Sequence, residues 1–147
     1  MTIEEQLTEL RLYLAKKFYG ATLETTPLKH GYTLVSIHNL RLPEGWNRNT
    51  STIHFRISPS YPYELPESMW AESGMLRLHN GRHAYNTNDG NRIPSDPNPS
   101  RSTTWFRLSP RAWRWDTDRL FQYFHIMLDR LQRPESGLKA AYWWGES

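Results

Sequence analysis

Apolar residues recur at every third or fourth position across residues 2–18, a spacing typical of an amphipathic helix with one buried face. Thr2 and Glu5 have the spacing of a capping box, which predicts that the helix begins at this threonine. Gly20 is expected to end it. The residues predicted to face a sheet are Ile3, Leu7, Leu10, Leu14 and Phe18.

A strict alternation follows at residues 53–58, where apolar and polar side chains exchange at every position. This period of two predicts a strand that buries one face, with Ile53, Phe55 and Ile57 inside. The other face would carry His54, Arg56 and Ser58. Three prolines, Pro59, Pro62 and Pro66, predict a stiff loop after this strand, and a second short strand is expected around Met69 and Trp70.

A β-rich segment at residues 32–37, YTLVSI, predicts a strand before the alternating one. Between them lies RLPEGWNRNT, whose Pro43, Gly45 and asparagines indicate a hairpin-type connection. We therefore expect three or four consecutive antiparallel strands after one helix, an α+β arrangement.

Residues 73–102 carry only one short apolar alternation and are otherwise rich in asparagine, glycine and proline, which predicts a long irregular loop. A second amphipathic helix is expected after it, capped by Asp116 or Thr117 and limited by Pro134. Its buried face would hold Leu120, Phe124, Met127, Leu128 and Leu131. The tail at 134–147 contains Tyr142, Trp143 and Trp144, which need a surface to cover them.

At 147 residues the chain predicts a single domain, residues 1–147. No segment is apolar enough to cross a bilayer and the acidic start is unlike a secretory leader, so we expect a soluble, cytoplasmic protein. Cysteine is absent, which excludes disulfides, thiolate metal ligands and a thiol nucleophile.

The net charge of +3 comes from 14 arginines and 4 lysines against 15 acidic residues, and it suits an acidic protein partner as well as nucleic acid. Seven tryptophans favour a protein interface, because tryptophan and arginine dominate such surfaces. The interleaving in WFRLSPRAWRW leaves a nucleic-acid-binding module as an alternative, in which rings stack on bases. No recognised nucleic-acid motif supports that alternative.

Histidine spacing gives little indication of a metal. His79 and His83 are four residues apart, with Asp89 and Asp96 nearby, but the expected loop setting and the lack of an H-E-x-x-H pattern argue against zinc. We expect neither a metal nor a cofactor. His125, on the second helix, is expected to be a half-buried packing residue.

The order of helix, antiparallel strands, Tyr-Pro-x-x-x-Pro loop, aromatic strand, irregular segment, tryptophan turn and helix resembles the ubiquitin-conjugating (UBC-like) fold. The resemblance looks strongest to a bacterial branch that accompanies activating enzymes and multi-ubiquitin-like proteins, where a Trp-x-x-x-Ser stretch, here residues 105–109, precedes the last helix. The residues that carry it are Ile53, Phe55, Ile57, Tyr61, Pro62, Pro66, Trp70, His79, Asn80 and Trp113.

This resemblance implies a protein that accepts the C-terminus of a ubiquitin-like protein from its adenylating activating enzyme. It also implies that His79 braces a loop and that Asn80 stabilises an oxyanion, although the proline of the family's His-Pro-Asn signature is missing here. The family's catalytic cysteine is missing as well. The chain is therefore an inactive adaptor, uses another nucleophile, or had its cysteine replaced.

A serine nucleophile needs a base or strong oxyanion stabilisation, and it would form an oxyester in place of a thioester. The interval in which the family holds its acceptor contains Ser95, Ser100, Ser102 and Ser109. We rank Ser109 first and Ser102 second, because Ser109 lies between Trp105 and Trp113 and is flanked by Arg107 and Arg111. These four flanking residues and Tyr61 are the expected partner-binding set.

Overall fold

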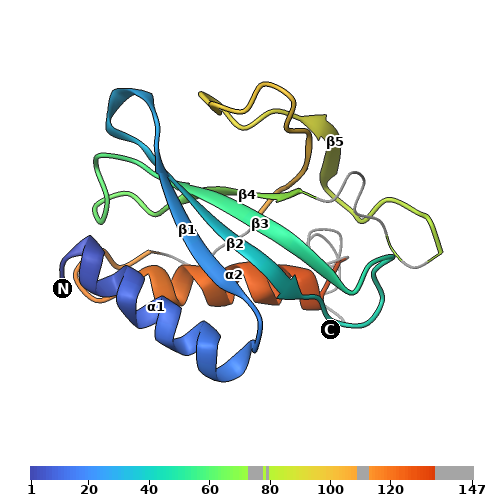
Figure 1. Ribbon diagram of the computed structural model, residues 1–147, viewed down its shortest axis with the longest axis horizontal. Coiled ribbons are helices and arrows are strands. Elements are labelled where there is room, and N and C mark those ends of the chain that lie inside the picture. The colour runs from blue at the N-terminus through green and yellow to red at the C-terminus, as the bar shows by residue number, and fades with distance from the viewer. Residues whose placement is uncertain (73–77, 79, 109–112, 135–147) are drawn as a thin grey trace, which may run out of the picture.

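The computed structural model describes residues 1–72, 78, 80–108 and 113–134, which form two α-helices, a short 3₁₀ turn and one six-stranded sheet. Figure 1 shows both helices on one face of the sheet. The elements in chain order are α1 (Ile3–Lys17), β1 (Thr22–Pro27), η1 (Lys29–Gly31), β2 (Thr33–Arg41), β3 (Thr50–Ile57), β4 (Glu67–Glu72), β5 (Thr87–Asn91), β6 (Thr103–Phe106) and α2 (Leu120–Gln132).

The sheet is antiparallel throughout, in the order β1-β2-β3-β4-β6-β5. Strands β2, β3 and β4 confirm the three strands and the hairpin connection expected from the sequence. The expected α+β class is confirmed too, but the sheet is larger than the three or four strands predicted. No helix in the described ranges is long and apolar enough to cross a membrane.

Strand β5 corrects the prediction that residues 73–102 form one irregular loop, and β6 adds an unpredicted strand between that segment and the second helix. The sequence of β5 is TNDGN, which contains residues depleted in strands. It is a strand because its backbone pairs with β6, Thr87 opposite Phe106 and Asn88 opposite Trp105. Partners from elsewhere in the chain, and not its own composition, hold it extended.

The two helices begin differently. In α1 the capping box is confirmed, since Thr2 Oγ1 accepts from the Glu5 amide at 3.1 Å and Glu5 Oε1 accepts from the Thr2 amide at 2.8 Å. The prediction that Asp116 or Thr117 caps α2 is wrong. Asp118 closes the preceding turn, and the N-cap is Arg119, whose amide donates to the Gln122 side chain.

The main core lies between the helices and the sheet, as the apolar patterns predicted, except that Ile3 is exposed and does not belong to it. Phe55 from β3 contacts Tyr123 from α2 with ring centroids 5.1 Å apart. From α1, Leu7, Leu10 and Leu14 are almost fully buried. The helix faces and the inward-facing strand residues together form one continuous cluster.

The opposite face of the sheet is also covered, which corrects the prediction that β3 buries one face. Residues 92–102, here named the strap, lie over this face in Figure 1. Ile93 from the strap packs with Leu34 and Trp70 in a second apolar cluster. His54, expected to face solvent, is 0% exposed. The strap covers the His54 side chain. The alternation in β3 could not predict this, because it reflects the residues of β3 alone.

Candidate functional site

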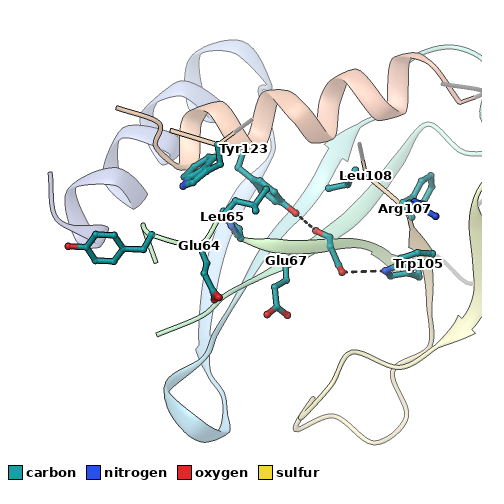
Figure 2. Close-up of a pocket in the computed structure, with 12 residues that line it drawn as sticks. Glu64, Leu65, Glu67, Trp105, Arg107, Leu108 and Tyr123 are labelled. Carbon is teal, nitrogen blue, oxygen red and sulfur yellow. Dashed lines mark hydrogen bonds between the residues drawn. The ribbon is translucent and has the colours of Figure 1, made fainter. Parts of the chain in front are cut away.

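A pocket of about 650 Å³ opens where the start of β4, the end of β6 and the first turn of α2 meet (Figure 2). Aromatic and aliphatic side chains make most of its wall, with a few charged groups at the rim. The lining residues are Tyr63, Glu64, Leu65, Pro66, Glu67, Ser68, Trp105, Phe106, Arg107, Leu108, Trp113 and Tyr123. This composition is typical of a small ligand site with few orienting polar groups.

The proline loop forms one side of the pocket and is fixed from both directions. The Tyr61 side chain is buried, and its hydroxyl donates to the Gln6 side chain of α1. Trp113 Nε1 donates to the Pro62 carbonyl at 2.6 Å, and the rings of Tyr61 and Trp113 lie 6.0 Å apart. The loop and the approach to α2 are thus joined.

The first residues of β4 form the floor of the pocket, where two aromatic donors converge on Ser68. Tyr123 donates its hydroxyl to the Ser68 carbonyl at 2.6 Å, and Trp105 Nε1 donates to Ser68 Oγ at 3.3 Å (Figure 2). Burial raises the pKa of Tyr123 well above its ordinary value of 10.0, so its hydroxyl stays protonated and remains a donor.

The two carboxylates of the wall have partners of their own. Glu67 forms an ion pair with Arg56 on the adjacent strand, and Glu64 accepts from the Ser58 hydroxyl at 3.2 Å. The Arg107 backbone is held at both ends, because its amide donates to Asn86 and its carbonyl accepts from Arg130 Nε at 2.9 Å. Both carboxylates of the wall are therefore engaged, and the Arg107 backbone is fixed in place.

Arg130 fixes the segment that leaves β6. Its side chain is 4% exposed and donates to three carbonyls, those of Arg107, Tyr85 and Pro134. Its guanidinium also lies over the Phe106 ring, 5.2 Å from the centroid. One buried cation thus joins α2, the end of β6 and the segment before β5.

The structure brings three predicted binding residues, Trp105, Arg107 and Trp113, into the pocket wall. Tyr61 contacts Trp113 from the core side. The predicted residues Ser109, Arg111 and His79 lie outside the described residues. Residues 109–112 connect Leu108 to Trp113, and both of these line the pocket.

Two predicted catalytic residues do not line the pocket. Asn80 is exposed, and its side-chain oxygen accepts from the Arg82 amide at 3.0 Å within its own turn. Ser102 is exposed and precedes β6, whereas Arg107 follows it, so the two ends are separated by roughly 15 Å of strand. Ser100, also considered earlier, donates to Asn98 in a surface turn.

Sequence reasoning missed the residues that complete the pocket, Tyr63, Glu64, Leu65, Glu67, Ser68, Phe106, Leu108 and Tyr123. Tyr63 and Leu65 belong to the proline loop, so proximity to Tyr61 was a usable signal. Ser68 and Tyr123 gave no such signal, because Ser68 lies in a short strand and Tyr123 lies on the core face of a helix.

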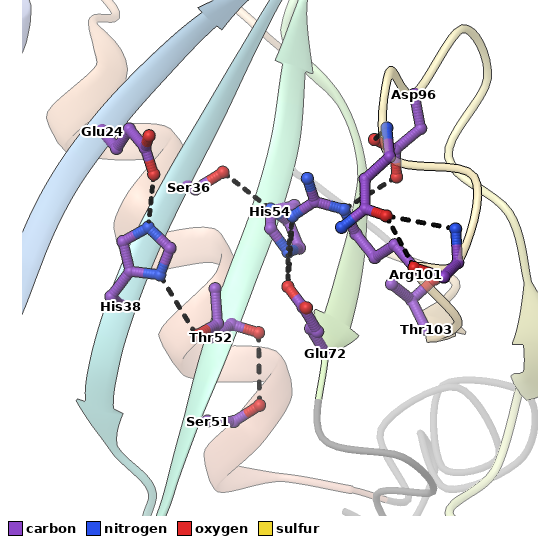
Figure 3. A network of polar contacts seen from close by, with 12 residues as sticks. Glu24, Ser36, His38, Ser51, Thr52, His54, Glu72, Asp96, Arg101 and Thr103 are labelled. Atoms are coloured by element: carbon purple, nitrogen blue, oxygen red, sulfur yellow. Dashed lines mark hydrogen bonds and ion pairs between the residues drawn. The ribbon is translucent and has the colours of Figure 1, made fainter.

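A second polar cluster, on the strap side of the sheet, has the spacing of a nucleophile, a base and an orienting carboxylate (Figure 3). Ser36 Oγ lies 2.7 Å from His54 Nδ1, and His54 Nε2 lies 2.8 Å from Glu72 Oε1. Because Ser36 is 2% exposed and His54 is 0% exposed, no substrate can reach them. Arg101 from the strap closes the cluster through Glu72 and Asp96, so its role is to hold the strap.

The remaining histidines do not form a metal site in the described part of the chain. His83 and Asp89 are 3.7 Å apart at the surface, and no group of three or more potential ligands occurs among the described residues. The prediction for His125 is wrong in its burial, since this side chain is exposed. Its ring still packs on Phe121 and Tyr13.

Comparison with known proteins found no matching protein-family model, no matching curated protein and no matching solved structure. The function must therefore be argued from the fold and the pocket.

Proposed function

We propose that this chain is a ubiquitin-conjugating-like protein of a bacterial modification pathway. Its pocket between β4, β6 and α2 binds the C-terminal tail of a ubiquitin-like protein, which an adenylating activating enzyme delivers. The observation that carries the proposal is the meeting of the Tyr-Pro loop and Trp113 at one pocket, through the 2.6 Å bond from Trp113 Nε1 to the Pro62 carbonyl.

The arrangement of elements supports the same proposal. A capped helix, a four-strand antiparallel meander β1–β4 and a helix lying across one sheet face follow the order that the UBC-like resemblance implies. Strands β5 and β6 extend that meander at the edge beside the pocket. The pocket wall includes Pro66 and Trp113, two of the residues that carry the resemblance.

The chemistry of the wall supports binding more directly than transfer. Trp105, Trp113 and Leu65 offer apolar surface to an extended chain, and the carboxylate of Glu67 is engaged by Arg56. The described lining residues include no histidine that could serve as a general base. Recognition of a tail without covalent chemistry is thus the form of the function that the geometry supports best.

Ester formation on Ser109 is the second candidate, supported by the sequence, in which Ser109 directly follows one lining residue, Leu108, and precedes another, Trp113, by four positions. In this reaction Ser109 Oγ forms the ester bond to the terminal carbonyl carbon of the tail. The thiolate of the activating enzyme leaves and takes up the hydroxyl proton. The product is an oxyester, which hydroxylamine cleaves and a reductant does not.

Mass spectrometry and calorimetry distinguish these forms. The protein is incubated with ATP and with the ubiquitin-like proteins and adenylating enzymes encoded in the same genome. If the protein binds a ubiquitin-like protein without forming an adduct, and Trp113→Ala lowers the affinity at least tenfold, the result supports recognition alone. A hydroxylamine-sensitive adduct that is lost in Ser109→Ala and retained in the control Ser102→Ala supports transfer. Neither binding nor an adduct with any of these proteins would overturn the proposed function.

A further inference from the structure

Ser68 has a backbone conformation that is unusual for a residue inside a strand. Its φ is +60°, in the left-handed region that favours glycine. The register explains why, because His54 pairs with Trp70 while Arg56 pairs with Glu67, so β4 carries one extra residue at this point. A glycine is the usual residue at such a bulge position.

The location of this strained residue is informative. The other described non-glycine residues with positive φ are His30, Asn39, Asn86 and Ser95. None of these lines the pocket, whereas Ser68 does. Strained backbone retained at a concave site indicates a functional constraint on the side chain, because a glycine would relieve the strain.

The hydrogen bonds of Ser68 leave its hydroxyl proton available. Trp105 Nε1 donates to Ser68 Oγ at 3.3 Å, so the oxygen acts as an acceptor in this contact. Tyr123 donates to the Ser68 carbonyl and fixes the backbone from the other side. Among the described residues, no contact provides an acceptor for the Ser68 hydroxyl proton, which leaves this hydroxyl available as a donor at the floor of the pocket.

We infer that Ser68 is a ligand-binding residue whose hydroxyl donates a hydrogen bond to a backbone carbonyl of the bound tail. The inference rests on the proposed function and names the chemistry by which the pocket recognises its ligand. A neutral donor beside Trp105 and Leu65 suits an uncharged amide carbonyl in an extended segment. Recognition of this kind reads the main chain of the tail and tolerates different side chains.

The test replaces Ser68 by glycine and measures both stability and affinity. The probes are fluorescein-labelled peptides carrying the C-terminal segments of ubiquitin and of the ubiquitin-like proteins encoded in the same genome, followed by fluorescence polarisation. Ser68→Gly should bind about 3- to 10-fold more weakly, the effect of one lost hydrogen bond. Its melting temperature should be unchanged or higher, because glycine adopts φ +60° without strain.

Ser95→Gly is the matched control, since Ser95 has φ +63° but is exposed in the strap, outside the pocket. This variant should keep the affinity of the parent protein. Trp105→Phe removes the indole donor to Ser68 Oγ and keeps an aromatic ring. If Ser68 acted only as a brace for Trp105, both substitutions would weaken binding equally and the double variant would add nothing.

The outcomes separate the two proposals. Peptide binding by the parent protein with unchanged affinity in Ser68→Gly and in Ser68→Ala would overturn the role of Ser68 alone. A loss of affinity in both variants, additive with that of Trp105→Phe, supports it. Failure of the parent protein to bind any of the peptides would contradict the proposed function and this inference together.

Discussion

Acidification should destabilise this protein through His54. The ring is buried between Ser36 and Glu72, and burial is the largest cause that lowers its pKa below the ordinary 6.5. A carboxylate only accepts, so His54 Nε2 carries the proton that is donated to Glu72, and Nδ1 accepts from the Ser36 hydroxyl. The folded state therefore holds the neutral ring.

The surrounding charges explain why Glu72 does not reverse this preference. Arg101 Nη1 lies 3.2 Å from Glu72 Oε1 and 3.3 Å from His54 Nε2, so the carboxylate already has a cationic partner. Asp96 also pairs with Arg101 and does not contact the ring. His38 adds a further unfavourable interaction with a charged His54. Protonation of His54 would add a second positive charge beside Arg101. Burial of the ring and the charge of Arg101 both disfavour it.

The sign and size of the effect follow by linkage. Neutral His54 contributes its full stabilisation above the unfolded pKa of 6.5, and this contribution is lost as the pH falls through that value toward the lowered folded pKa. If only the unfolded chain takes up the proton, lowering the pH from about 6.5 to about 5.5 reduces the free energy of unfolding by about 1 kcal/mol.

Urea denaturation at a series of pH values measures this contribution in the parent protein and in His54→Gln. The difference between the two free energies of unfolding should shrink over that interval, by up to about 1 kcal/mol. His125→Gln is the matched control, because it makes the same substitution at an exposed histidine instead of a buried one. A difference that stays constant, or grows on acidification, would refute the buried neutral ring.

Three further substitutions test contacts that hold the pocket and the first helix, each by urea denaturation. Arg130→Met leaves three carbonyls without their donor and should lower the free energy of unfolding by about 3 kcal/mol; a loss below about 1 kcal/mol would contradict the bonds described. Tyr123→Phe removes the donor to the Ser68 carbonyl and should lower the free energy of unfolding by about 1 kcal/mol; an unchanged free energy would contradict this bond. Thr2→Ala should also cost about 1 kcal/mol, and an unchanged midpoint would argue against the capping box.

The elements that the sequence predicted correctly have a local signal. The capping box of Thr2 and Glu5 fixed the start of α1, and Pro134 lies just beyond the end of α2 at Gln132. The alternation in β3 correctly put Phe55 in the core. In each case neighbouring residues alone decide the conformation or the buried face.

The predictions failed where contacts with segments distant in the sequence determine the conformation or the burial of a residue. The residues of β5 carry no strand pattern, and they are extended because β6 supplies backbone partners. His54 has the position of a solvent-facing residue in β3, but Arg101 from the strap lies against it, with Nη1 3.3 Å from His54 Nε2. Periodicity reports one element at a time, so it cannot reveal a loop that returns over a sheet.

The candidate site divides in the same way. The sequence by itself determined that tyrosine, proline and tryptophan residues were available, and it placed Trp105 and Trp113 in the binding set. The tertiary structure decided that these residues meet Tyr123 and Ser68 at one pocket. The physical reason is that β4, β6 and α2 contribute to the pocket from separate parts of the chain, and only their packing brings the side chains within reach of one ligand.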